Sequence, residues 1–266
     1  MSRRILTFVV ISLLCVLVMP LHAQSSSETL TVFAAASLAD AFEEIALSFE
    51  AAHPGVDVVF NFAGSSTLAT QLAEGSPADV FASANNAQMT VARDAERIAG
   101  DDQTFARNRL VLIVPAENPA NILTLRDLAE PGVQLVLAAP GVPVRGYADA
   151  MLESMAANPL YGEDYRSAVL ANLVSEEDNV RQVAAKVALG EADAGIVYIS
   201  DVTPDIRDQV RMLYVPNRFN TIATYPIAVT NDAANPELAQ AFVDAVLSDE
   251  GQAVLESWGF VRVPGR

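Results

Sequence analysis

Two serines stand where a predicted strand meets a predicted helix, a placement suited to binding a small anion. Ser37 follows the apolar run at 30–34 and precedes a segment whose apolar residues recur at helical spacing. Ser65 repeats this arrangement after the apolar run at 56–62. The first N–H groups of a helix lack intrahelical acceptors and lie at the positive end of the helix dipole, so anions bind there. The pair predicts two helix N-termini that converge on one ligand, although either serine alone is better explained as an ordinary N-cap.

Neutral hydrogen-bond donors also occur at turns in the second half of the chain. They comprise the loop at 142–147, which includes Val144, a helix start at Val180, and Tyr198 at the end of a short apolar strand. Tyr198 alone would be interpreted as a core aromatic residue whose hydroxyl finds a local partner. Because all of these turns could face one cleft, we expect them to contribute to the same site as the two serines.

The elements that must position these turns are alternating strands and helices. Between residues 30 and 95 the predicted order is strand, helix, strand, helix, strand, helix, and such alternation indicates a parallel α/β sheet. A second block opens with a long strand at 107–115, stopped by Pro115, and continues to about residue 220. Ligands of such sheets bind beyond the carboxyl ends of the strands, which is where the serine turns fall.

The C-terminal segment is too short to form a domain of its own, so we expect it to return to the first block. It holds a strand-like stretch at 223–230, in which Pro226 suggests an edge position or a bulge, and then two helices. The predicted fold class is α/β with two lobes, each a mostly parallel sheet flanked by helices, and a ligand cleft between them. The expected boundaries are 28–107 and 222–266 for lobe I, and 108–221 for lobe II.

The N-terminus has the composition of a secretory signal peptide. Arg3 and Arg4 form a basic start, residues 5–19 are apolar, and Ala23 is a small residue suited to cleavage. We therefore expect residues 1–23 to be removed and the mature protein to be secreted to the periplasm. The apolar run is too short and wrongly flanked for a stable membrane span.

Charge and residue usage argue against several functions. The formal net charge of −17 disfavours binding to nucleic acid or to anionic membranes. Cleavage after Ala23 would remove the only cysteine and leave His53 as the one histidine, so we expect no thiol nucleophile and no Cys/His metal cluster. The acidic run at 176–178 could hold a hard cation, but it is better explained as an acidic first turn of the following helix.

A serine hydrolase would need a base close to Ser37 or Ser65. His53 lies beside Pro54 at a predicted helix end, and the chain has no Gly-x-Ser-x-Gly turn. Lys186 is the only lysine, so a Ser-x-x-Lys pair is also missing. We expect the protein not to be an enzyme, and the hydrolase stays as a weaker alternative.

Several stretches, in the right order along the chain, resemble the periplasmic molybdate-binding proteins (ModA type) of ABC transporters. The resemblance covers essentially the whole chain after the signal peptide and lies in residues 34–38, 62–69, 77–84, 142–148, 177–181 and 195–201. It implies a site in which the hydroxyls of Ser37, Ser65 and Tyr198 hold a tetrahedral oxyanion. It also implies backbone N–H contacts from Ser37, Ser65, Val144 and Val180.

One departure from the family pattern lies directly after Val144. The family commonly has a glycine in the next position, whereas this chain has Arg145 followed by Gly146. The departure would bring a positive charge near the mouth of the cleft. Arg145 is also the one cleft residue we can name that suits the carboxylate of an organic acid.

The resemblance implies a substrate-binding protein that captures molybdate or tungstate and delivers it to the membrane permease of an ABC transporter. We expect no cofactor, no nucleic-acid partner and a monomer. Neutral donors favour a fully deprotonated anion, because a protonated one turns an O–H toward groups that can only donate. Hydrogen phosphate should therefore be rejected. The alternative is the same fold with sulfate, thiosulfate or a small organic anion as the ligand.

Overall fold

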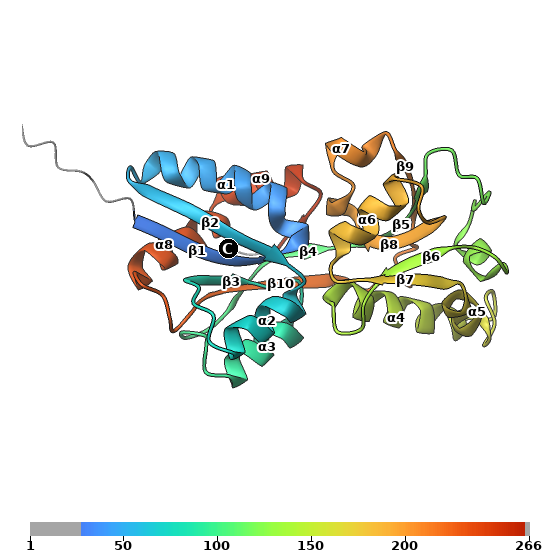
Figure 1. The fold of residues 1–266 in the computed structure, drawn as a ribbon, viewed down its shortest axis with the longest axis horizontal. Coiled ribbons are helices and arrows are strands. Elements are labelled where there is room, and N and C mark those ends of the chain that lie inside the picture. The colour runs from blue at the N-terminus through green and yellow to red at the C-terminus, as the bar shows by residue number, and fades with distance from the viewer. Residues whose placement is uncertain (1–27, 264–266) are drawn as a thin grey trace, which may run out of the picture.

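The chain forms two lobes that lie side by side, each built on its own β-sheet (Figure 1). The computed structural model describes residues 28–263, so the predicted signal peptide at 1–23 lies outside the described residues. The chain passes from the first sheet to the second directly after Asn108 and returns in the segment between Tyr214 and Ala223. Within the described range, no helix is long and apolar enough to cross a membrane.

The sheet of lobe I has six strands in the order β11-β4-β10-β3-β1-β2. β1 pairs with β2 and β3 in parallel, whereas β10 runs antiparallel to both β3 and β4, and β11 antiparallel to β4. The strands are β1 (Glu28–Ala35), β2 (Val56–Ala63), β3 (Val80–Ala82), β4 (Gln103–Asn108), β10 (Ala223–Val229) and β11 (Val261–Arg262).

The sheet of lobe II has five strands in the order β7-β6-β8-β5-β9. β6 pairs with β7 and β8 in parallel, and β5 runs antiparallel to β8 and β9. The strands are β5 (Leu110–Pro115), β6 (Leu135–Ala138), β7 (Leu173–Glu177), β8 (Ala194–Tyr198) and β9 (Val210–Tyr214).

Helices cover both faces of each sheet (Figure 1). In lobe I they are α1 (Ala39–Ala52), α8 (Pro236–Leu247) and α9 (Asp249–Ser257) on one face, and α2 (Ser65–Ala73) and α3 (Asn86–Asp94) on the other. In lobe II they are α6 (Val180–Ala188) and α7 (Pro204–Arg207) on one face, and α4 (Pro143–Ala156) and α5 (Tyr165–Ala171) on the other. Three short 3-10 helices complete the described range: η1 (Ala36–Leu38), η2 (Leu125–Ala129) and η3 (Ile199–Asp201).

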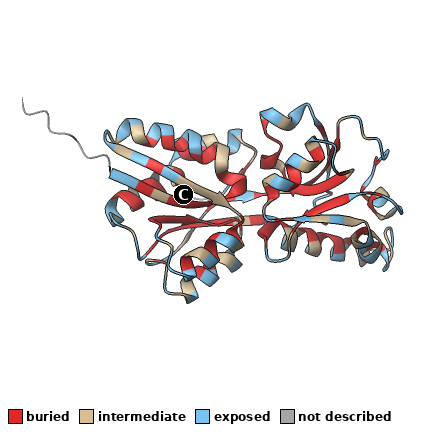
Figure 2. Ribbon diagram, viewed as in Figure 1, coloured by how far each residue is buried: buried red, intermediate tan, exposed pale blue. Residues whose placement is uncertain are grey.

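The core of lobe I is an aromatic cluster between the sheet and α1. The ring of Phe42 lies 5.7 Å from that of Phe105, 6.0 Å from that of Phe242 and 6.2 Å from that of Phe60. Burial is concentrated on the strands and on the inner faces of the helices in both lobes (Figure 2). Buried apolar residues of both lobes join in one large cluster, and a second, smaller cluster lies between the sheet of lobe I and the helices α2 and α3.

A glycine brings α6 close to the sheet of lobe II. A Cβ atom at Gly195, in the middle of β8, would lie only 2.9 Å from methyl groups of Val183 and Val187 on α6. Because real Cβ contacts are longer than this, only glycine allows the helix to pack at this depth. The packing fixes the position of the first turn of α6, which begins at Val180.

Three expectations about the fold need correction. Each sheet is mixed rather than mostly parallel, because the strands that enter from the other lobe run antiparallel to their neighbours. The single strand expected at 107–115 is two strands in two different sheets, separated at Arg109. Pro226 lies on β10, between β3 and β4 and not at an edge, but the register shift beside it confirms the predicted bulge.

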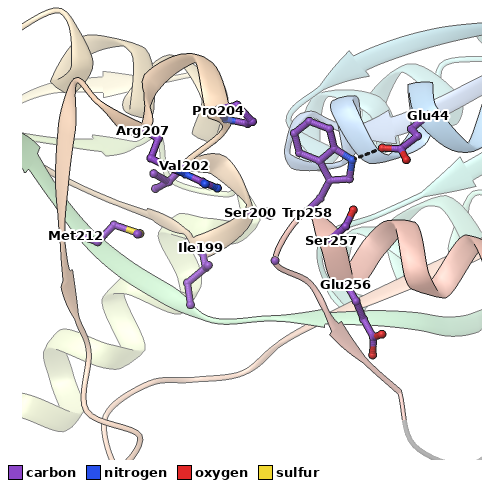
Figure 3. Close-up of a pocket in the computed structure, with 11 residues that line it drawn as sticks. Glu44, Ile199, Ser200, Val202, Pro204, Arg207, Met212, Glu256, Ser257 and Trp258 are labelled. Atoms are coloured by element: carbon purple, nitrogen blue, oxygen red, sulfur yellow. Dashed lines mark hydrogen bonds between the residues drawn. The ribbon is translucent and has the colours of Figure 1, made fainter.

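A groove separates the two lobes on the side of α1, α9 and α7, with a volume of about 280 Å³ (Figure 3). Trp258 and Glu44 line it from lobe I, and the indole Nε1 donates to Glu44 Oε2 at 2.7 Å. Pro204 and Arg207 line it from lobe II, across from the indole ring.

Candidate functional site

A small cavity lies between the lobes at the carboxyl ends of several strands. It is lined by Ala35, Ala36, Ser37, Gly64 and Ala84 from lobe I and by Val142, Pro143, Val144, Asn179, Val180 and Tyr198 from lobe II. The cavity has a volume of about 10 Å³, near the minimum that one water molecule requires. Four of the five predicted site residues, Ser37, Val144, Val180 and Tyr198, thus meet at one cavity.

Ser37 lies in the 3-10 turn η1, between the end of β1 and the start of α1. Its side chain is buried, and its Oγ lies 3.0 Å from the hydroxyl oxygen of Tyr225 on β10. A plain N-cap of α1 was the alternative for this serine. Leu38 holds the N-cap position of α1 without a side-chain hydrogen bond, so Ser37 does not serve as that cap.

Ser65 is the first residue of α2, and its side chain is buried beside the cavity. It does not line the cavity itself, whereas its neighbour Gly64 does. The Oγ of Ser65 accepts a hydrogen bond from the backbone N–H of Ala84 at 3.0 Å. Because this bond occupies the oxygen as an acceptor, the hydroxyl hydrogen is available for donation to a ligand.

The amides of Val144 and Val180 belong to the first turns of α4 and α6. Pro143 is the first residue of α4 and Val144 the second, and Val180 is the first residue of α6. The N-cap side chain of Asn179 accepts from the N–H of Gln182, so it does not occupy the Val180 amide. N–H groups at such positions have no partner within their own helix. They add two backbone donors at the lobe II side of the cavity.

Tyr198 ends β8 with its side chain fully buried. Within residues 28–263, its hydroxyl oxygen has no hydrogen-bond partner. Burial raises the pKa of Tyr198 well above its usual value, and the neighbouring Tyr225 and Tyr147 act in the same direction. The hydroxyl therefore keeps its proton and remains a neutral donor. A buried unpaired hydroxyl is costly, so it marks a position where a ligand would supply the missing acceptor.

Arg145 does not supply the positive charge expected near the cleft mouth. Its Nε lies 3.1 Å from Asp149 Oδ2, and its Nη1 lies 2.5 Å from Glu176 Oε1 and 3.0 Å from the carbonyl oxygen of Ala138. Two carboxylates thus neutralise the guanidinium, and Arg145 is not among the residues that line the cavity beside Val144. This removes the residue that an organic acid would need.

The acidic run at 176–178 belongs to strand β7 and its end, not to a helical first turn as we expected. Glu177 pairs with Lys186 at 2.6 Å and Glu176 with Arg145. Among the described residues, no group of three or more His, Cys, Asp or Glu side chains could hold a metal ion. His53 caps the C-terminus of α1, with Nδ1 2.9 Å from the carbonyl oxygen of Phe49, which confirms the expected helix-end position.

An ion-pair cluster that the sequence did not reveal crosses the cleft beside the cavity. Arg181, next to Val180 on α6, lies 3.0 Å from Asp201 Oδ1 in its own lobe and 2.6 Å from Asp40 Oδ2 in lobe I. Asp201 is fully buried, and burial raises the pKa of its carboxyl to about 6 although Arg181 opposes the shift. The Oδ2 of Asp201 accepts from the N–H of Tyr198 at 3.0 Å. The cluster therefore links the site tyrosine to the contact between the lobes.

The lobes also touch through neutral groups around the cavity. Gln88 Nε2 of lobe I donates to the carbonyl oxygen of Gly141 of lobe II at 3.1 Å, and the Tyr147 hydroxyl accepts from the N–H of Thr224 at 3.2 Å. With Arg181 and Asp40 in contact as well, the structure has the lobes closed over the cavity.

This combination of two lobes, two crossing segments and a closed interlobe cavity of neutral donors defines a solute-binding protein. The model of the bacterial extracellular solute-binding protein family matches residues 30–261, and the chain belongs to that family. The molybdate-binding protein ModA of Mycobacterium tuberculosis is 39% identical to it over 243 residues, which cover 91% of this chain and 88% of that protein.

Solved structures share the same fold. The substrate-binding domain of a putative molybdenum ABC transporter from Clostridium difficile matches with a TM-score of 0.65 and 28% identity, over 89% of this chain and 100% of that one. The sulfate-binding protein SubI from Mycobacterium tuberculosis matches with a TM-score of 0.80 over 89% of this chain and 88% of that one. At 19% identity, the likeness to SubI concerns the fold alone.

Proposed function

We propose that the protein captures molybdate or tungstate between its lobes and delivers the anion to the membrane permease of an ABC transporter. The observation that carries the proposal is the buried Tyr198 hydroxyl, unpaired among the described residues, in a cavity lined by helix N-termini. The similarity to ModA supports the choice of anion. The contacts with the oxyanion would come from the hydroxyls of Ser37, Ser65 and Tyr198 and from the amides of Ser37, Ser65, Val144 and Val180.

Neutral donors suffice to hold a dianion in this acidic chain. Each hydrogen bond to a charged acceptor contributes about 1.5–3 kcal/mol. A set of five to seven would exceed an association cost at the lower end of the 4–15 kcal/mol range. The repulsion from the acidic surface is screened beyond about 8 Å at physiological ionic strength. Binding thus depends on short-range donors, which also explains why no cation has to line the cavity.

Opening of the lobes would admit the anion. Relative movement would break the contact between Arg181 and Asp40, and it would separate the lobe I donors from those of lobe II. Only the closed arrangement lets Ser37 and Tyr198 reach the same anion. We infer that closure and capture are one event, and that the permease receives the closed protein.

We further infer that the protein is a secreted periplasmic monomer that needs no cofactor and catalyses no reaction. The partners of the two candidate serines support this. The oxygen of Ser37 meets the Tyr225 hydroxyl, and that of Ser65 meets a backbone N–H. Neither partner is a base at neutral pH, so neither serine is activated as a nucleophile.

Calorimetric titration of the ligand-stripped mature protein with molybdate, tungstate, sulfate and phosphate tests the proposal. We expect stoichiometric binding of the first two anions and none of phosphate. Ser65→Ala should weaken molybdate binding at least tenfold, by about one charge-assisted hydrogen bond. Ser66→Ala, one residue further along α2, is the matched control and should bind as the wild type does. Tight binding of sulfate alone, or of none of the four anions, would refute the proposed ligand.

A further inference from the structure

We propose that Asn108 and Tyr225 form a directed hydrogen-bond chain that makes the Ser37 hydroxyl a donor toward the ligand. The inference rests on the proposed function, and it concerns two residues that do not line the cavity between the lobes. Both are positioning residues, because they would act through Ser37 rather than touch the anion. Their consequence is selectivity for anions that carry no proton.

The chain begins at Asn108, the last residue of β4, whose side chain is completely buried. Its Oδ1 accepts from the backbone N–H of Arg109 at 2.9 Å. This bond identifies the oxygen of the side-chain amide, so the opposite end is the NH₂ group, which can only donate. That group lies 2.8 Å from Ser200 Oγ and 3.5 Å from the hydroxyl oxygen of Tyr225.

The next member of the hydrogen-bond chain is Tyr225, a fully buried residue on β10. Its hydroxyl oxygen faces the donor group of Asn108 on one side and Ser37 Oγ at 3.0 Å on the other. Either hydroxyl can donate in the Tyr225–Ser37 pair; because Asn108 cannot accept, the proposed chain places the tyrosine hydrogen on Ser37 Oγ. Burial raises the pKa of Tyr225 well above its usual value, so this hydrogen is retained throughout the physiological range.

Ser37 then has one direction left for its own hydrogen. In this arrangement the oxygen of Ser37 accepts the hydrogen bond from Tyr225, and the hydrogen of Ser37 is free to point at the cavity that Ser37 lines. Ser65 is oriented in a similar way, because its Oγ accepts a hydrogen bond from the backbone N–H of Ala84. With a hydrogen-bond donor behind each serine, both hydroxyl hydrogens remain available for an anion in the proposed site.

This polarity selects against protonated anions. An anion such as hydrogen phosphate has to place one O–H somewhere in the site, and a donor-only site offers it no acceptor. Without the tyrosine hydroxyl, Ser37 can rotate and accept from the ligand. Removing one oxygen atom at Tyr225 should thus relax the exclusion of hydrogen phosphate.

A double-mutant cycle measures whether Tyr225 acts through Ser37. The wild type, Tyr225→Phe, Ser37→Ala and the double variant are titrated with molybdate. We expect Tyr225→Phe to weaken binding about tenfold in the wild-type background, by about one hydrogen bond. In the Ser37→Ala background the same change should have no further effect. An equal loss in both backgrounds, or no loss in the wild-type background, overturns the chain while the proposed function stands.

Selectivity provides a readout that a merely structural role would not change. Excess phosphate should compete with molybdate on Tyr225→Phe but not on the wild type, whereas general loosening would weaken both anions alike. Tyr165→Phe is the matched control, because it removes another buried tyrosine hydroxyl, one that donates to the carbonyl oxygen of Leu125 within lobe II. It should leave affinity and selectivity unchanged. A wild type that binds neither molybdate nor tungstate would overturn the proposed function, and the chain with it.

Discussion

Substitution of Gly64 by alanine should prevent full closure of the lobes without harming either lobe. A Cβ atom at Gly64 would lie 2.5 Å from the carbonyl oxygen of Asp178, which belongs to the opposite lobe. That oxygen is part of the backbone next to the start of α6, so no side chain can turn aside to make room. The backbone of Gly64 has φ −60° and ψ 134°, which alanine adopts without strain.

The geometry sets the expected loss of affinity. Non-bonded carbon–oxygen contacts settle at about 3.3–3.6 Å, so the lobes must separate by about 1 Å at this point. The same displacement would stretch the hydrogen bonds from Val180 and Val144 beyond a useful length. Losing two bonds to a charged acceptor costs about 3 kcal/mol at the lower end of their range, or roughly a hundredfold in Kd.

Two measurements separate this effect from damage to the fold. Calorimetry should show the hundredfold loss for molybdate, while urea unfolding of the ligand-free protein should show Gly64→Ala at least as stable as the wild type. Gly146→Ala is the matched control, since a Cβ atom there has no neighbour within 4 Å. It should bind normally and gain about 1 kcal/mol of helix stability. Wild-type affinity of Gly64→Ala would refute the closure argument.

Three further predictions concern the tyrosine and the ion-pair cluster. Tyr198→Phe should weaken molybdate binding about tenfold or more by calorimetry yet leave the midpoint of thermal unfolding unchanged or higher, since it removes an unpaired buried hydroxyl; lower stability with normal affinity would contradict its role. Asp40→Asn should weaken binding only a few-fold, and less at high salt, because its contact with Arg181 is partly exposed; a salt-independent effect would exclude an electrostatic origin. The folded state raises the pKa of Asp201 from 3.8 to about 6, so it holds this proton more tightly than the unfolded chain does. The contribution of this bound proton to the free energy of unfolding is fully present below pH 3.8 and is lost as the pH rises through 6. Relative to Asp201→Asn, the wild type should therefore lose about 2–3 kcal/mol of unfolding free energy between pH 4 and pH 7, and a pH-independent difference in urea unfolding would contradict this.

The candidate site was accessible from the sequence because its residues lie at ends of elements. Ser37, Val144, Val180 and Tyr198 each follow or begin a recognisable strand or helix, and the carboxyl ends of strands within a sheet share an edge. The identity of the donors could thus be read locally. Their convergence on one cleft was expected from their position at turns, and the family resemblance then specified which hydroxyls and amides take part.

Structural features that depend on contacts between residues far apart in the chain could not be predicted from the local sequence. Residues 107–109 are polar and stand directly before the apolar run 110–115, a sequence that is compatible with one continuous strand, so nothing local shows that the chain changes sheets there. Strand β7 was missed because its sequence, Leu-Val-Ser-Glu-Glu, is polar, and Glu177 is neutralised by Lys186 from a later helix. Tyr225 is 188 residues from Ser37, and only the folded sheet brings them together.

The groove between the lobes has an optical consequence. Trp258 is the only tryptophan in the chain, and it lines the groove from lobe I with lobe II directly opposite (Figure 3). Indole emission responds to the polarity and the charges around the ring, and Arg207 and Pro204 move relative to it whenever the lobes open. The native protein thus carries a single fluorophore at the moving boundary. Stopped-flow fluorescence can follow the rate of anion capture without any label, and without a second tryptophan to obscure the signal.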